Sequence, residues 1–598
     1  MIRNTRNYTS FTYFNIAQFL GALNDNIFKL LIIFLLIEVE GIERSNIVLS
    51  SAAAIFVIPF LLFSQASGVL ADRKSKRNVI VAMKLMEVVV MFLGMISFWM
   101  ESKYGSYFIL FMMATQSAIF GPSKYGIVPE IVNRDRISKA NGLLSMFTYL
   151  AIILGTFLAS FLTDITGRNF VLSGFCCTLI ALLGFWSSTK IEHTPPSGSK
   201  DKYTIFFLPE IYTTILRARK RSHLLTVMLG ASFFWFLATF MQLNIIPFAM
   251  KSLSLSDVQG GYLFILIALG IGLGSVLAGK ISGKSVELGL VPFGGLGLVI
   301  AALLMTIFAV HLKAVMVIVI IMGMAGGIFA IPQESFIQYA SADKFRGQTI
   351  GAFNFLSFCG VLCAAIVLYL VGEVWKLSPR QAFFFMGCLT MIVTLLIMFA
   401  IFDRFLKFLS VIISRIFFNI STNKSEEYFK RPKIIVVNHA SWTKTLLLMA
   451  TRYRGMHLVM KCSEKHYRWK APLYRLFKMI PIVDSEKPYY TAKLMKDVHN
   501  SIKHGMSIGV YINEARLGDD ITRKKEVLYY KPTEKIFKET VCSIVPVRIY
   551  RKKHGRSMFS LIDLFTYGRT PVKIVFSEDI SRENPLDDIE KNFIKSKK

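Results

Sequence analysis

The stretch Gly21-Ala-Leu-Asn24-Asp25-Asn26-Ile-Phe-Lys29 places four polar side chains in a segment that is otherwise apolar from about residue 11 to residue 37. Such a segment is long enough to cross a bilayer, which takes about 20 apolar residues. A carboxylate near mid-membrane costs on the order of 2.5–3.5 kcal/mol, so Asp25 needs compensation. Lys29 follows one helical turn later and can share a face with it. Two interpretations remain: a structural ion pair, or a site for substrate or coupling ion that lines a cavity.

The composition is that of a membrane protein. Of the 598 residues 54% are hydrophobic, and the mean hydropathy is +0.51. A soluble chain of this length does not carry so many unbroken apolar runs. Twelve such runs precede residue 403, six on each side of a polar stretch at about 189–223. We therefore predict an all-α membrane domain over residues 1–402 with twelve transmembrane helices.

The charge distribution bears on location and partners. The formal net charge is +31, and basic residues gather in alternate loops and beyond residue 403. By the positive-inside rule, both termini are cytoplasmic, in a cytoplasmic membrane. A basic domain tethered to a membrane predicts contact with anionic membrane lipids rather than with nucleic acid. The cysteines and histidines show no metal-ligand spacing, so we expect no metal and no bound cofactor.

A loop motif recurs in the two halves. The chain reads Val69-Leu70-Ala71-Asp72-Arg73-Lys74-Ser75 after the second run and Val276-Leu277-Ala278-Gly279-Lys280-Ile281-Ser282 after the eighth. This is the pattern of a duplicated six-helix transporter. Gly68, Asp72 and Arg73 resemble the cytoplasmic loop 2–3 signature of the major facilitator superfamily. The resemblance covers roughly residues 10–402 and implies the 6+6 major facilitator fold, with these three residues in a conformational latch. A charge cluster that only sets topology is the alternative.

Two further stretches resemble one branch of this superfamily. The fourth run contains Phe120-Gly121-Pro122-Ser123-Lys124-Tyr125-Gly126-Ile127-Val128-Pro129-Glu130, and the tenth contains Ile331-Pro332-Gln333-Glu334. Their prolines and glycines predict kinked or broken helices. With Asn24-Asp25-Asn26, they resemble the lysophospholipid transporter branch of the superfamily, in which the transporter is often fused to an acyltransferase. The resemblance implies a lysophospholipid substrate, and we expect Asp25, Lys29, Lys124 and Glu334 to line its path.

Other polar residues inside apolar runs allow more than one interpretation. Lys84 and Glu87 stand three residues apart, which favours a structural ion pair over a site. Gln242 and Asn244 stand two apart and point in different directions on a helix. One of them could face a cavity while the other hydrogen-bonds a neighbouring helix.

The pattern changes after residue 402. Residues 403–424 comprise a short, very apolar helix with one polar stripe, which predicts an interfacial amphipathic helix, and a polar linker. Residues 425–598 alternate β-branched and helical runs, which predicts an α/β domain. Four blocks there resemble, in order, the glycerolipid acyltransferase family of acylglycerophosphoethanolamine type. They are Ile435–Lys444, Ile480–Asp484, Tyr511–Arg516 and Ser543–Val547.

This second resemblance implies an acyltransferase site, with acyl carrier protein or a coenzyme A thioester as acyl donor. Asn438 would contact the substrate, His439 would be the general base, and Glu514 and Arg516 would complete the site, with Arg516 gripping a phosphate. The family's orienting aspartate is replaced by Lys444. A lysine cannot accept the imidazole proton, and its charge opposes imidazolium. We therefore expect an impaired or repurposed domain, and a working acyltransferase is the alternative.

The sequence thus predicts a transporter that moves lysophospholipid inward and passes it to the carboxy-terminal domain at the inner leaflet. The enzyme-class alternative is an active acyltransferase for which the helical bundle is a lipid-feeding anchor. The third reading is a general superfamily exporter of small polar or drug-like solutes that carries a vestigial domain.

Overall fold

The computed structural model describes two compact units, Met1–Ala400 and Ile401–Lys598, and each is considered by itself. The residues that it describes are 2–201, 207–283, 285–424, 428, 431–438, 447–448, 456–463, 471, 474, 479–484, 487–503, 505–512, 531–540, 542–551 and 569–580.

The first unit is all-helical, as its long apolar runs predict. Its helices are α1 (Ile2–Glu40), α2 (Ser45–Arg73), α3 (Lys76–Trp99), α4 (Lys103–Ile131), α5 (Ile137–Ile165), α6 (Phe170–Thr189), α7 (Phe207–Arg219), α8 (Leu224–Leu253), α9 (Asp257–Ser282), α10 (Val291–Ile307), α11 (Leu312–Ala340), α12 (Arg346–Tyr369) and α13 (Pro379–Ala400). The short helix α7 lies in the stretch that the sequence presented only as polar.

Eleven of these helices are long and apolar enough to cross a membrane. The twelfth predicted span is α4. It is as long as its neighbours, but its hydropathy is too low for it to be among the eleven. The reason is that α4 carries Gln116, Ser117 and Lys124 in its middle turns. A helix of this kind is stable in a membrane only when other helices cover its polar face.

The helices are not broken at their prolines. Helix α4 continues through Pro122 and Pro129, and α11 continues through Pro332. A proline inside a helix removes one backbone donor and crowds the carbonyl of the preceding turn, so a kink at these positions stays a prediction. The last turns of α11, from Ile331 to Gln338, are buried on every side, so their neighbours hold the helix in place.

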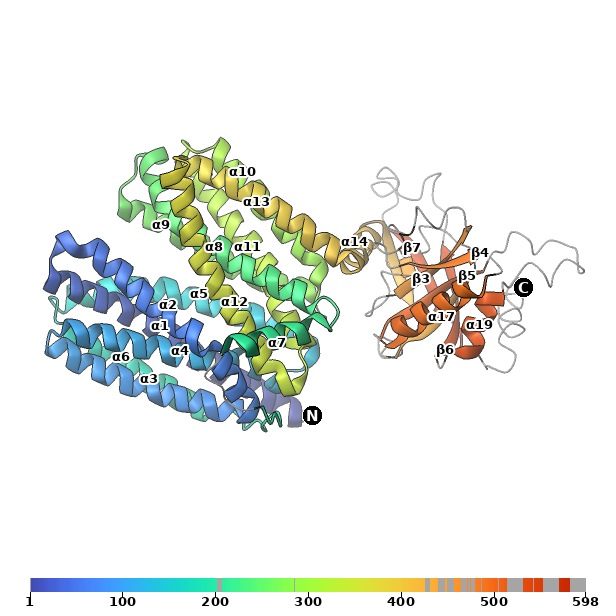
Figure 1. Cartoon of the computed structure of the whole chain (residues 1–598), viewed down its shortest axis with the longest axis horizontal. Helices are drawn as coiled ribbons and strands as arrows, with labels where there is room; N and C mark the ends of the chain where they lie inside the picture. The colour runs from blue at the N-terminus through green and yellow to red at the C-terminus, as the bar shows by residue number, and fades with distance from the viewer. Residues whose placement is uncertain are drawn as a thin grey trace, which may run out of the picture. The chain divides into compact units, whose positions relative to one another are not determined.

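The helices form two groups, α1–α6 and α8–α13, which we call the first and second halves. In Figure 1 the blue helices of the first half and the green-to-yellow helices of the second come closest near α7 and diverge away from it. The two halves match the six-and-six division that the apolar runs predict.

The second unit begins with α14 (Phe402–Phe417), the short helix expected there, and continues as an α/β fold. Its strands are β1 (Phe418–Thr422), β2 (Lys433–Asn438), β3 (Met456–Ser463), β4 (Ile480–Asp484), β5 (Ser507–Ile512), β6 (Ser543–Arg551) and β7 (Thr570–Phe576), with helices α17 (Pro488–Lys503) and α19 (Lys531–Glu539). The sheet order is β1-β7-β6-β2-β5-β3-β4. Among the strand pairs that the structure describes, only β6–β7 is antiparallel.

One boundary of this unit corrects the prediction. The residues expected to form a polar linker include β1, which pairs in parallel with β7 from Phe418 opposite Thr570 to Thr422 opposite Ile574. Its polar composition hid it, because an edge strand needs only one apolar face and Asn419, Ser421 and Thr422 lie on the other side or at the end.

A polar cluster secures the start of β2 to the chain after β7. Lys433 Nζ lies 3.0 Å from Asp579 Oδ2 and 3.9 Å from the Tyr428 ring centroid. Burial opposes the charge on Asp579, but hydrogen bonds from Tyr428, Ser543 and Lys433 outweigh it and lower the pKa of the carboxyl.

Because its folded pKa is lowered, Asp579 contributes stability above its unfolded pKa and loses that contribution as the pH falls through the folded value. Asp579→Asn should therefore increase hydrogen exchange in β6 and β7 at pH 7. The difference from the wild-type chain should vanish in strong acid. The effect is expected to stay below about 1 kcal/mol because the side chain is partly exposed. Equal exchange of both proteins at pH 7 would contradict the role of this cluster.

Candidate functional site

A close ion pair in the middle of the first half joins Lys84 and Glu87 of α3. Lys84 Nζ lies 2.6 Å from Glu87 Oε2, and both side chains are 2% exposed. Asn24 Nδ2 of α1 donates to the other carboxylate oxygen at 3.4 Å. The prediction of a structural pair is confirmed.

Asp25 and Lys29 of α1 do not form the ion pair that their spacing allows. Asp25 Oδ2 accepts a hydrogen bond from Ser117 Oγ of α4 at 2.8 Å. Its other oxygen is buried and has no hydrogen-bond partner among the described residues. Lys29 Nζ instead lies 5.4 Å from the centroid of the Phe56 ring of α2, within cation–π range. The interpretation as a structural pair is therefore wrong, because neighbouring helices supply other partners.

Lys124 belongs to α4 of the first half and Glu334 to α11 of the second. Their charges interact, and Glu334 also interacts with Tyr125 of α4 and Tyr149 of α5. Lys124 Nζ lies 5.4 Å from the Tyr125 ring centroid. Within the part of the chain that the structure describes, neither Lys124 nor Glu334 takes part in a direct ion pair. The two side chains thus place opposite charges near each other, from opposite halves, without a direct ion pair.

Of the three carboxylates and three lysines just described, one pair is in direct contact. Glu87 and Lys84 neutralise each other, and the four that remain are Asp25, Lys29, Lys124 and Glu334. Charged groups at this depth are costly unless they find partners. A ligand that carries both a phosphate and an ammonium group could supply partners of both signs.

The polar residues of α8 divide as their spacing allows. Asn244 is buried and donates from Nδ2 to the carbonyl of Pro379 at 2.9 Å, so it serves packing against α13. Gln242 is exposed.

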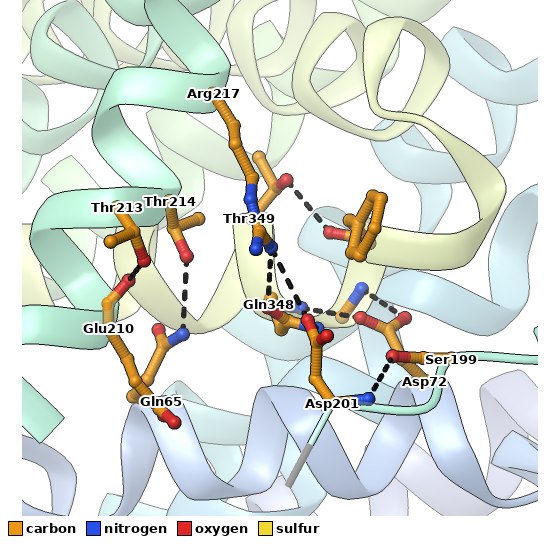
Figure 2. Close-up of polar contacts among 12 residues, drawn as sticks. Gln65, Asp72, Ser199, Asp201, Glu210, Thr213, Thr214, Arg217, Gln348 and Thr349 are labelled. Atoms are coloured by element: carbon orange, nitrogen blue, oxygen red, sulfur yellow. Dashed lines mark hydrogen bonds and ion pairs between the residues drawn. The ribbon is translucent and has the colours of Figure 1, made fainter. Parts of the chain in front are cut away.

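The two halves are joined at one end of the bundle, which we call the closed end. Asp72, at the end of α2, accepts hydrogen bonds from the backbone nitrogens of Gly347 at 2.7 Å and Gln348 at 2.9 Å (Figure 2). Its carboxylate thereby caps the amino terminus of α12, where the helix dipole favours negative charge. A Cβ atom on Gly68 would lie 2.6 Å from the Gly347 oxygen, so this approach requires glycine. Arg73 is exposed and takes no part in these bonds.

Two further contacts join the halves at the closed end, and the sequence did not predict them. Asn141 of α5 and Gln338 of α11 exchange two hydrogen bonds of 3.0 Å each. Glu130 of α4 lies 2.6 Å from Lys76 Nζ and 4.0 Å from Arg346 Nη1 of α12. The sequence does place amides and charged residues in the last turns of apolar runs. Spacing within one helix, however, does not identify their partners on other helices.

The structure describes only some of the residues expected to form an acyltransferase site. Asn438 ends β2 and stands opposite Ile512 at the end of β5, so these two neighbouring strands end side by side. His439, Lys444, Glu514 and Arg516 lie outside the described residues.

Comparison with known proteins gives the following. A sequence profile of the Major Facilitator Superfamily matches residues 14–362 and 228–407. The lysophospholipid transporter LplT of Photorhabdus laumondii is 24% identical over 345 residues, which cover 56% of this chain and 80% of that protein. The protein of the same name from Yersinia pestis is 23% identical over 364 residues, covering 60% and 84%.

Two solved structures are similar in fold. The human organic anion transporter MFSD10 has a TM-score of 0.56 at 15% identity, covering 65% of this chain and 99% of that one. A bacterial homologue of the iron transporter ferroportin, in an outward-facing state, has a TM-score of 0.53 at 14% identity, covering 67% and 99%. At these identities the likeness concerns the fold alone.

Proposed function

The chain belongs to the Major Facilitator Superfamily, and from this premise we propose that it carries lysophospholipids across a membrane. The observation that carries the proposal is the set of four charged side chains, Asp25, Lys29, Lys124 and Glu334, that have no direct ion pair among the residues the structure describes. The lysines would bind the phosphate, and the carboxylates would bind an ammonium or hydroxyl group. The relatives named as lysophospholipid transporters support this substrate class.

The test is a flipping assay with purified protein in vesicles. Fluorescent lysophosphatidylethanolamine is added outside, and the fraction protected from a membrane-impermeant quencher is measured. Protein-containing vesicles should protect the lysolipid several-fold faster than empty ones and should not move a diacyl phospholipid. Solute-driven proton flux without lysolipid flipping would favour the alternative of a general exporter.

We further propose that the closed end faces the cytoplasm and that both termini lie there. Basic residues crowd this end, in the turn after α2 and in α7, as the positive-inside rule requires of cytoplasmic loops. Transport then requires the halves to separate at the closed end so that lysolipid can leave toward the inner leaflet.

Asp72→Ala should favour the separated state. The variant removes the carboxylate that caps α12 and leaves two buried N–H groups without an acceptor. Spin labels at Lys74→Cys and Lys344→Cys, two exposed positions on opposite halves, report the distance across the closed end. In a background without the native cysteines, the longer distance should gain population by about tenfold or more. An unchanged distribution would contradict the role of Asp72.

The carboxy-terminal unit, we propose, descends from glycerolipid acyltransferases and binds lysolipid with little or no acyl transfer. The ancestry is supported by β2 and β5, two neighbouring strands that end side by side and carry two of the family's blocks. The loss of acyl transfer is supported by Lys444, which stands in place of the orienting aspartate. Acyl transfer from acyl carrier protein thioester to lysolipid should be near background in the wild-type chain and should rise in Lys444→Asp. Substantial wild-type turnover that His439→Ala abolishes would favour the enzyme alternative.

A further inference from the structure

The linker between the halves contacts the second half in several places, and the polar contacts among its described residues converge on one side chain of α12. Its described parts are residues 190–201 and α7. The Gln348 side chain of α12 donates from Nε2 to Asp201 Oδ2 at 3.0 Å and accepts at Oε1 from Arg217 Nη1 at 3.3 Å. Arg217 also lies 3.3 Å from Asp201 (Figure 2). Gln348 therefore joins three elements: its backbone binds Asp72 of α2, and its side chain binds Asp201 before α7 and Arg217 within α7.

The same linker is fixed to the first half along its length. Arg77 of α3 donates to the carbonyls of Thr189 at 2.7 Å and Ile191 at 3.1 Å. Lys76 donates to Ser197 Oγ at 2.6 Å. In α7, Thr214 Oγ1 accepts from Gln65 Nε2 of α2 at 3.3 Å. These contacts lie within one half and need not change when the halves separate.

We propose that the linker is a second latch, separate from Asp72, that holds the closed end together through Gln348. When the halves separate, a linker bonded to both cannot keep all of its contacts. We expect the bonds of Gln348 to Asp201 and Arg217 to break, because the linker is also bonded to α2 and α3. The proposal rests on the proposed function only in assuming that the halves move relative to each other.

The second latch differs from Asp72 in its contact with water. Asp72 is 0% exposed, whereas the side chains of Arg217 and Asp201 are 48% and 39% exposed. Salt screens exposed charges and leaves buried ones largely unaffected. Arg217 also lies 4.7 Å from the Phe345 ring centroid, a contact to the second half that water weakens less. The linker thus makes the closed state sensitive to ionic strength.

The deciding variant is Gln348→Ala, which removes the side chain that binds the linker and keeps the backbone N–H that binds Asp72. With the labels at positions 74 and 344, the ratio of long to short distances should rise about tenfold, equivalent to about 1.4 kcal/mol. Thr213→Ala is the matched control, because the Thr213 hydroxyl bonds only the Glu210 carbonyl within α7. Its distance distribution should equal that of the wild-type chain.

Charge reversal provides an independent test. Asp201→Arg alone and Arg217→Asp alone should each favour the long distance, and the double reversal should restore the short one, because an amide can bind the exchanged pair after rotation. Raising NaCl from about 50 to about 500 mM should favour the long distance in the wild-type chain and have little effect in Gln348→Ala. Unchanged distances in folded Gln348→Ala and in both single reversals would overturn the second latch. Normal latch behaviour in a protein that flips no lysolipid would overturn the proposed function instead.

Discussion

Lysolipid flipping is expected to fall by about a hundredfold or more when Asp25→Asn and Lys124→Ala are combined. Each substitution removes one charge from the interior, and a hydrogen bond to a charged group contributes about 1.5–3 kcal/mol. Two such losses correspond to at least two powers of ten. Because Asp25 already has a bond from Ser117 and an oxygen without a partner, its amide variant keeps the packing and loses the charge.

The assay is the vesicle experiment described above, with initial rates compared at equal amounts of reconstituted protein. Thr115→Ala is the matched control on α4, since the Thr115 hydroxyl bonds only the Phe111 carbonyl of its own helix at 2.8 Å. It should flip lysolipid at the wild-type rate. Wild-type flipping by the double variant would remove Asp25 and Lys124 from the substrate path.

Glu87→Ala is expected to destabilise the protein by about 3–5 kcal/mol. The variant leaves the buried Lys84 ammonium without its carboxylate partner, which is the costly way to disrupt an internal ion pair. The Lys84 Nζ packs against Gly21, 2.1 Å from where a Cβ on that glycine would lie. Replacing both residues by leucine should restore much of the stability, since no charge is then left unpaired.

Thermal unfolding in detergent, followed by loss of the monodisperse peak in size-exclusion chromatography, measures this effect. Glu38→Ala is the control, because it disrupts the Arg168–Glu38 pair, whose side chains are 70% and 46% exposed. Exposed pairs contribute at most about 1 kcal/mol. If Glu87→Ala unfolds at the same temperature as Glu38→Ala, the Lys84–Glu87 pair does not stabilise the first half.

The sequence predicted contacts within a helix better than contacts between helices. The Lys84–Glu87 pair follows from helical spacing, and the membrane bundle follows from the apolar runs. Spacing failed for Asp25 and Lys29, because Ser117 and Phe56 on other helices became their neighbours.

Contacts at the closed end depend on which helix ends meet. Asp72 could be singled out by its motif, but its acceptor role toward α12 depends on Gly347 and Gln348, which lie about 275 residues away. The same limitation hid α7 and β1, whose sequences are polar and whose structure depends on what they pack against or pair with.

The absence of a side chain at Gly68 has a kinetic consequence. Where α2 meets α12, backbone touches backbone, and the same is true of α5 and α9, where a Cβ on Gly142 would lie 2.5 Å from the Ser275 oxygen. At such a surface few side chains lose rotamer freedom when the helices meet or regain it when they separate. The change in side-chain entropy is therefore small in both directions. Turnover should then be limited by breaking the few polar bonds at the closed end, and larger residues at these glycines would slow the cycle by preventing the helices from meeting.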